Sequence, residues 1–163
     1  MSIGQSMIAE FDQEMVTTRR VLERIPSDKG TWKPHEKSFS VGHLAQLVAR
    51  MPGWIPLTVN HPKLDLSQAT PYSYETTAAL LEDFDRNVRE ARDALANVTD
   101  EQMHQPWALT MGDKTLMTLP RGAVVRQNIN HLVHHRGQLT VYLRLLDIPV
   151  PSVYGPTADE RWA

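Results

Sequence analysis

The sequence contains no cysteine, and this absence removes several kinds of chemistry at once. The chain forms no disulfide, offers no thiolate to a metal ion or an iron–sulfur cluster, and has no thiol nucleophile. Any sulfur chemistry at this protein therefore requires a thiol that a small molecule brings.

Long apolar runs and an excess of basic charge are also missing. No stretch reaches the roughly 20 apolar residues that cross a bilayer, and acidic side chains come too early for a signal peptide. The net charge is −2 at pH 7, and the scattered basic residues form no stripe that could neutralise a phosphate backbone. We therefore expect a cytoplasmic protein that binds neither membranes nor nucleic acid.

What remains is the composition of one globular domain. The chain has 163 residues, of which 41% are hydrophobic and 22% are charged. A chain of this length encloses a single hydrophobic core. We expect residues 1–163 to form one domain.

Apolar residues at helical spacing predict the main elements. Steps of three and four residues predict helices over roughly 4–25, 41–55, 81–98 and 120–146. Ser40 is a suitable N-cap for the second helix, and Pro52 and Pro56, which lack a backbone donor, should bend it near Trp54. The pattern predicts an all-α protein, a four-helix bundle.

The segment before the last helix lacks this periodicity. Residues 107–109 and 116–119 flank the turn Met111-Gly112-Asp113-Lys114, which predicts a small hairpin. Glu101 and His104 have the spacing of half a di-iron motif, but no second copy exists, and we interpret Glu101 as a helix-start acid. No GxSxG motif and no glycine-rich phosphate loop are present.

The last helix carries two stripes at helical spacing. One is apolar and is interrupted by Arg136, for which we favour an ion pair with a carboxylate such as Glu10 or Glu14 over the alternative, an anionic ligand. The second is mostly polar and consists of Asn128, His131, His135, Gln138, Tyr142 and Leu145. Polar groups beside a core need partners, water or an ion, so we interpret the second stripe as the wall of a pocket.

His131 and His135 stand one helical turn apart, a spacing that lets two imidazoles approach one metal ion. A complete site needs a third donor, and His43 at the start of the second helix is a candidate, although it is also typical of a structural histidine. Leu132 stands where an HExxH protease requires glutamate. A hydrogen-bonded histidine pair without metal remains the alternative.

The run from His131 to Leu139, HLVHHRGQL, resembles the HxxxHRGQL signature of the DinB/YfiT-like superfamily. Three further segments resemble members of this superfamily in the same order: Trp32-Lys33-Pro34-His35, Gly42 to Trp54, and Val150 to Gly155. The family name refers to DNA-damage-inducible expression, a stress response, and implies no polymerase activity.

The resemblance implies a four-helix bundle, often a homodimer, in which three histidines bind Zn²⁺ or Ni²⁺ and leave coordination positions open. Two of these histidines match His131 and His135. The third normally lies on the second helix, where this chain has Leu47. The resemblance therefore implies an incomplete metal site unless His43, one turn earlier, substitutes.

Members with a known activity resemble thiol transferases and thiol-dependent isomerases, in which the metal lowers the pKa of an external low-molecular-weight thiol such as bacillithiol, mycothiol or glutathione. The first hypothesis is a divalent-metal-dependent enzyme of this kind, with Asn128, Gln138 and Tyr142 lining its pocket. The second is a catalytically silent binding or interaction module, which Leu47 favours.

Overall fold

The computed structural model describes residues 1–161. Its elements follow in the order α1 (Ile3–Leu22), η1 (Ser27–Lys29), α2 (Val41–Arg50), η2 (Met51–Gly53), α3 (Trp54–Asn60), β1 (Lys63–Asp65), η3 (Leu66–Gln68), α4 (Thr77–Asn97), α5 (Asp100–His104), β2 (Pro106–Met111), β3 (Lys114–Pro120) and α6 (Arg121–Leu145). The predicted ranges 4–25 and 120–146 correspond to α1 and α6.

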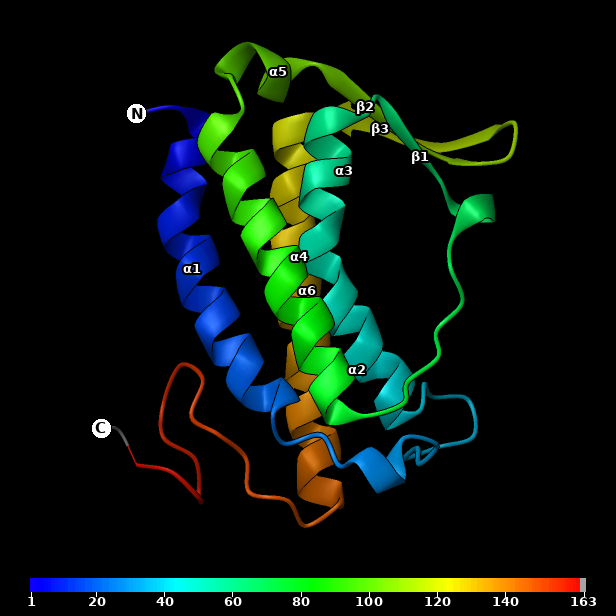
Figure 1. Cartoon of the computed structure of the whole chain (residues 1–163), viewed down its shortest axis with the longest axis vertical. Helices are drawn as coiled ribbons and strands as arrows, with labels where there is room; N and C mark the ends of the chain where they lie inside the picture. Colours follow the sequence, from blue (N-terminus) through cyan, green and yellow to red (C-terminus); the bar gives the residue numbers. More distant parts are fainter. Residues whose placement is uncertain (162–163) are drawn as a thin grey trace.

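The long helices form a bundle with one long crossover (Figure 1). Helices α1 and α6 run in one direction, and α2, α3 and α4 run in the other. Segment 61–76 leads from the end of α3 back along the outside of the bundle to the start of α4. Both α1 and α2 pack against α4 and α6, so α6 has neighbours on two sides.

Capping side chains fix where the helices begin. Ser2, Ser40, Thr76 and Thr99 each accept a hydrogen bond from the backbone N–H three residues later. Such a cap contributes about 1 kcal/mol, because it satisfies a donor that the helix itself leaves free. The prediction that Ser40 caps the second helix is confirmed, and Glu101 lies in the first turn of α5.

The second helix is interrupted, as its prolines predict. A 3₁₀ turn, η2, separates α2 from α3, and Pro52 lies in this turn. Pro56 is tolerated because it lies in the first turn of α3, where a backbone N–H has no helical partner. The break precedes Trp54, which begins α3.

A small sheet corrects the prediction of an all-α protein. The predicted hairpin is present as β2 and β3, which pair antiparallel, but β1 pairs parallel with β2 and makes a three-stranded sheet. The three residues of β1 are too few to show an alternating pattern. Asp65 ties this strand to the hairpin, because its Oδ1 accepts from the backbone N–H of Gly112 at 2.9 Å.

The core lies between the long helices. Its buried side chains include Phe11, Leu22, Leu44, Val48, Ile55, Phe84, Leu95, Ile129, Leu132, Leu139 and Leu143. Full burial of one such side chain contributes about 1.5–3 kcal/mol. Within residues 1–161, no helix combines the length and apolar character needed to cross a bilayer.

One charged residue of α6 lies inside this core. Arg136 is 1% exposed, and its Nη1 lies 2.6 Å from Oε2 of Glu14 on α1. Arg136 Nη2 donates to the hydroxyl of Tyr154, which donates in turn to Oε1 of Glu14. Burial and the bond to Glu14 raise the pKa of Tyr154. Of the two predicted partners, Glu14 is therefore the one that Arg136 uses; Glu10 pairs instead with Arg126.

Residues 148–161, which we name the C-terminal strap, fold back beside the lower end of α1 (Figure 1). Glu160 forms ion pairs with Arg20 of α1 and with Arg24 just after this helix, and Asp159 pairs with Arg144 of α6. The Tyr154 hydroxyl, described above, also belongs to this strap. The strap therefore joins the two helices that share the buried ion pair.

Replacing Arg136 with leucine should lower the free energy of unfolding by about 3–5 kcal/mol, because it leaves the buried carboxylate of Glu14 without its partner. Arg126→Leu is the matched control, since Arg126 pairs with Glu10 across the same two helices while both side chains are about two-fifths exposed. That change should cost less than about 1 kcal/mol. Chemical denaturation measures both, and equal losses would contradict a central role for Arg136.

Candidate functional site

The structure brings His131 and His135 together on α6. Their Nε2 atoms lie 2.9 Å apart, and their ring centroids are separated by 4.7 Å. Two nitrogens that bind one tetrahedral metal ion at about 2.1 Å lie about 3.4 Å apart, so a small opening of this pair admits an ion. As they stand, the two nitrogens share a hydrogen bond.

The surroundings of His131 favour its neutral imidazole. The ring of His131 lies against Trp54 of α3, with 6.0 Å between the centroids. Local burial, and then the neighbouring His135 and His134, lower the pKa of His131. A neutral imidazole offers the lone pair that a metal ion requires. The site therefore keeps an electron pair available near neutral pH.

Gln138 completes this arrangement one turn after His135. Its Oε1 lies 2.7 Å from Nδ1 of His135, the ring nitrogen opposite the one that faces His131. The three side chains form a continuous chain of hydrogen bonds along the exposed side of α6. Metal-binding histidines commonly use their second nitrogen in this way.

The rest of the predicted stripe is less enclosed than its interpretation as a pocket wall implied. Asn128 and Tyr142 are half-buried, and Leu145 is exposed, so the stripe borders solvent and needs no pocket to satisfy its polar groups. Tyr142 donates its hydroxyl hydrogen to the carbonyl of Phe39 and meets Trp32 edge to face. Its observed contacts therefore attach α6 to the loop before α2.

His43 lies in an aromatic stack on α2. Its ring is parallel to that of Phe39, with 4.4 Å between the centroids, and lies 4.2 Å from that of Tyr72 on the other side. The guanidinium of Arg50 covers the Tyr72 ring at 4.8 Å. Burial, followed by the charge of Arg50, lowers the pKa of His43. These contacts account for His43 as a structural residue that links α2 to the crossover segment.

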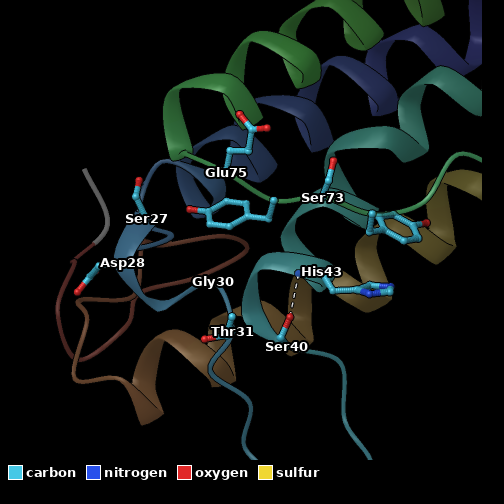
Figure 2. Close-up of a pocket in the computed structure, with 10 residues that line it drawn as sticks. Ser27, Asp28, Gly30, Thr31, Ser40, His43, Ser73 and Glu75 are labelled. Carbon is cyan, nitrogen blue, oxygen red and sulfur yellow. Dashed lines mark hydrogen bonds between the residues drawn. The ribbon is translucent and has the colours of Figure 1, made fainter.

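A pocket of about 430 Å³ opens beside this stack (Figure 2). It lies between the loop after α1, the start of α2 and the crossover segment, and Figure 2 shows the His43 ring directed away from the pocket's middle. Ser40 at its floor accepts from the backbone N–H of His43. His131, His135, Asn128, Gln138 and Tyr142 do not line this pocket.

The site offers a metal ion two protein ligands rather than three. Leu47, which stands where the resemblance places a histidine, is 8% exposed and belongs to the hydrophobic core. Within residues 1–161, no three His, Asp or Glu side chains gather in a group that could hold one metal ion. A metal at this site would thus rely on His131 and His135 alone among these side chains.

Trp54 and Gln138 have roles in the site that the sequence did not assign. Trp54 reaches His131 only because α3 packs against α6, and no spacing in the sequence signals a contact between residues so far apart. Gln138 was named as a pocket residue, but its position three residues after His135 does signal contact on a helix. Helical spacing could therefore have found one of the two.

Removing the ring of His43 should destabilise the protein without touching the histidine pair. His43→Ala loses two ring contacts, each worth about 0.5–1.5 kcal/mol, whereas His43→Phe keeps them. The lowered pKa means that the unfolded chain takes up the proton first, so the wild type loses stability as the pH falls below about 6.5.

As the pH falls from about 7.5 to about 5, the stability of His43→Phe relative to wild type should therefore rise. Thermal denaturation of both proteins across this range measures the effect. A constant difference would show that the ring of His43 does not titrate differently in the folded protein.

Comparison with known proteins agrees with the fold and the motif. The chain matches the DinB family over residues 1–162. It is 47% identical to the uncharacterized protein YrdA of Bacillus subtilis (strain 168) over 45 residues, a match that spans 28% of this chain and only 26% of YrdA.

Two solved structures share the architecture over nearly their whole lengths. A DinB-like protein from Bacillus subtilis superposes with a TM-score of 0.71 at 20% identity, covering 96% of this chain and 99% of that one. A DinB-like protein from Bacillus cereus ATCC 10987 gives 0.69 at 18% identity, covering 92% and 97%. At these identities the likeness concerns the fold. Together with the match over residues 1–162, it shows that this chain is a member of the DinB family.

Proposed function

We propose that this protein binds a divalent metal ion, Zn²⁺ or Ni²⁺, through the Nε2 atoms of His131 and His135. The 2.9 Å separation of these two atoms carries the proposal, because it places two good nitrogen donors side by side on a rigid helix. The exposure of His131 leaves a path for an ion and for a second molecule.

Two protein ligands give a weak and open site. Leu47 has no donor atom, so water or a substrate would complete the coordination. An open position is the feature that distinguishes a catalytic metal site from a structural one. The arrangement therefore suits chemistry better than it suits structural stabilisation.

The reaction class that we propose is transfer or isomerisation with an external low-molecular-weight thiol. A divalent metal, when bound, lowers the pKa of a thiol and so supplies a thiolate near neutral pH. The chain has no cysteine that could compete for the ion. The side chains of His131 and His135 would hold the ion, and the Trp54 ring beside His131 would bound one side of the space above it.

A catalytically silent member of the family is the second candidate. Leu47 favours it, because a buried leucine in place of a ligand is a natural result of losing selection for metal binding. In that case the fold would serve as a module for binding a small ligand or a protein. Metal affinity separates the two candidates.

Titration calorimetry of the untagged protein with Zn²⁺ and with Ni²⁺ should show weak binding that His131→Ala or His135→Ala abolishes. Leu47→His should tighten binding by at least about tenfold. Loss of a residue that only hydrogen-bonds to a metal ligand commonly weakens metal affinity by about 10–100-fold, and a third direct ligand should contribute no less. His134→Ala is the matched control, because His134 is also exposed on α6 but lies beside the pair, and it should change little.

His43→Ala should also matter less than loss of either member of the pair. Tight wild-type binding that His43→Ala abolishes would instead make His43 the third ligand. No detectable binding by the wild type would reject the metal proposal and leave the silent module. Circular dichroism of each variant, above all of Leu47→His, would establish that it folds.

We also propose that the protein forms a homodimer through the exposed patch of Gly137, Val141 and Leu145 on α6, which leaves His131 open to solvent. Val141 and Leu145 are 57% and 56% exposed and lie one turn apart, and a Cβ built on Gly137 meets no atom within 4 Å. Val141→Glu should weaken the dimer in sedimentation experiments, whereas Val16→Glu on α1, which is also exposed, should not. A wild type that is monomeric at micromolar concentration would contradict the proposal.

A further inference from the structure

The polar cavity beside His43 is used by neither candidate function. Its volume is about 430 Å³, and no residue of α6 lines it. Three segments border it, namely the η1 turn, the start of α2 and residues 72–75 of the crossover segment (Figure 2). Sites for small molecules commonly measure about 300–1,000 Å³. The cavity therefore has room for a small organic ligand.

The walls of this cavity are held in place by close contacts. The ring of Tyr74 lies against two glycines, because a Cβ built on Gly30 or on Gly42 would come within 2.6 or 2.7 Å of that ring. The backbone N–H of Gly42 donates to the carbonyl of Gly30 at 3.0 Å, and that of Ser73 donates to Oε1 of Gln46 at 2.6 Å. All three segments are thus tied together, and little ordering is left for a ligand to impose.

The charges that line the cavity are all negative. Asp28 of η1 and Glu75 of the crossover segment are both exposed, and no lysine or arginine lines the cavity (Figure 2). Asp28 has Lys29 as a distant partner, with 3.9 Å between the charged atoms, and Glu75 takes part in none of the ion pairs found within residues 1–161. Arg50 is occupied elsewhere, since its guanidinium donates to carbonyls of the crossover segment. A cleft with charges of one sign attracts ligands of the other sign.

The remaining lining residues also suit a cation. Tyr72, Tyr74 and His43 contribute aromatic rings, whose faces attract ammonium groups. Burial, followed by the charge of Arg50, lowers the pKa of His43, so its ring adds no positive charge at neutral pH. Hydroxyl groups, among them those of Thr31 and Ser73, accept hydrogen bonds from the donors of an ammonium group.

We propose that this cavity binds a small organic diammonium ion, with one ammonium group at Asp28 and the other at Glu75. The two carboxylates belong to different segments that border one cavity, so a flexible chain with a positive charge at each end satisfies both. A metal ion requires donors gathered around one point, and within residues 1–161 no three His, Asp or Glu side chains gather in this way. The site is independent of the metal proposed at His131 and His135.

Two-dimensional ¹H–¹⁵N NMR of the full-length protein locates even weak binding. Titration with the diamines putrescine and cadaverine should shift the amide signals of Gly30, Thr31, Ser73 and Glu75 in a saturable manner. Butanediol, which has the chain length of putrescine without its charges, should leave these signals in place, and butylamine, with one charge, should bind more weakly than putrescine. Equal effects of putrescine and butanediol, or saturable shifts confined to other parts of the molecule, would overturn the proposal.

Charge-removing variants test the two carboxylates. Asp28→Asn and Glu75→Gln should each weaken the binding of putrescine by about two- to fivefold, and the double variant by about tenfold, because each removes one exposed ionic contact. Glu36→Gln is the matched control, since Glu36 is exposed in the loop before α2 and does not line the cavity. It should bind as the wild type does.

Two results with these proteins would contradict the site. An unchanged affinity for putrescine in the double variant would show that the carboxylates do not hold the ammonium groups. Mg²⁺ that shifts the same amide signals and binds more tightly than either diamine would make the cavity a metal site instead. Circular dichroism of the variants would establish that they fold, since both substitutions lie on the surface.

Discussion

The ion pair between Arg136 and Glu14 is the interaction on which the rest of the structure depends. It crosses the interior between α1 and α6, and the hydroxyl of Tyr154 closes it from the C-terminal strap. A buried charge is tolerable only when its partner is held in place, so three separate segments must come together before either charge can be buried. The pair therefore specifies one arrangement of α1 against α6, whereas apolar packing alone would accept several.

One turn of α6 carries both the buried Arg136 and the exposed histidine pair. Neighbouring residues on a helix point about 100° apart, so His135 faces outward while Arg136 faces the core. The histidine pair is consequently attached to the most firmly positioned part of the bundle. The buried ion pair thus sets the rotation of the turn that carries His135, and such rigid support is what a preorganised site requires.

The sequence predicted what short-range spacing controls. The helix ranges, the Ser40 cap, the bend caused by Pro52 and the hairpin follow from local chemistry, and the adjacency of His131 and His135 follows from the four-residue step. The parallel strand β1, the stack of Phe39, His43 and Tyr72, and the contact of Trp54 with His131 depend on how distant segments meet. The polar stripe of α6 shows the remaining limit, because periodicity gives the side of a helix but not how deeply neighbours cover it.

The C-terminal strap has a consequence for how the fold is completed. It is synthesised after both helices that it joins, and its ion pairs through Asp159 and Glu160 reach back to Arg144 and to α1. Until the strap emerges from the ribosome, Glu14 lacks the hydrogen bond from the hydroxyl of Tyr154. Helix α1, made before the other helices described here, is thus among the last to reach its final environment, and a nascent chain that stalls before the strap would present α1 and α6 without the contacts that join them there.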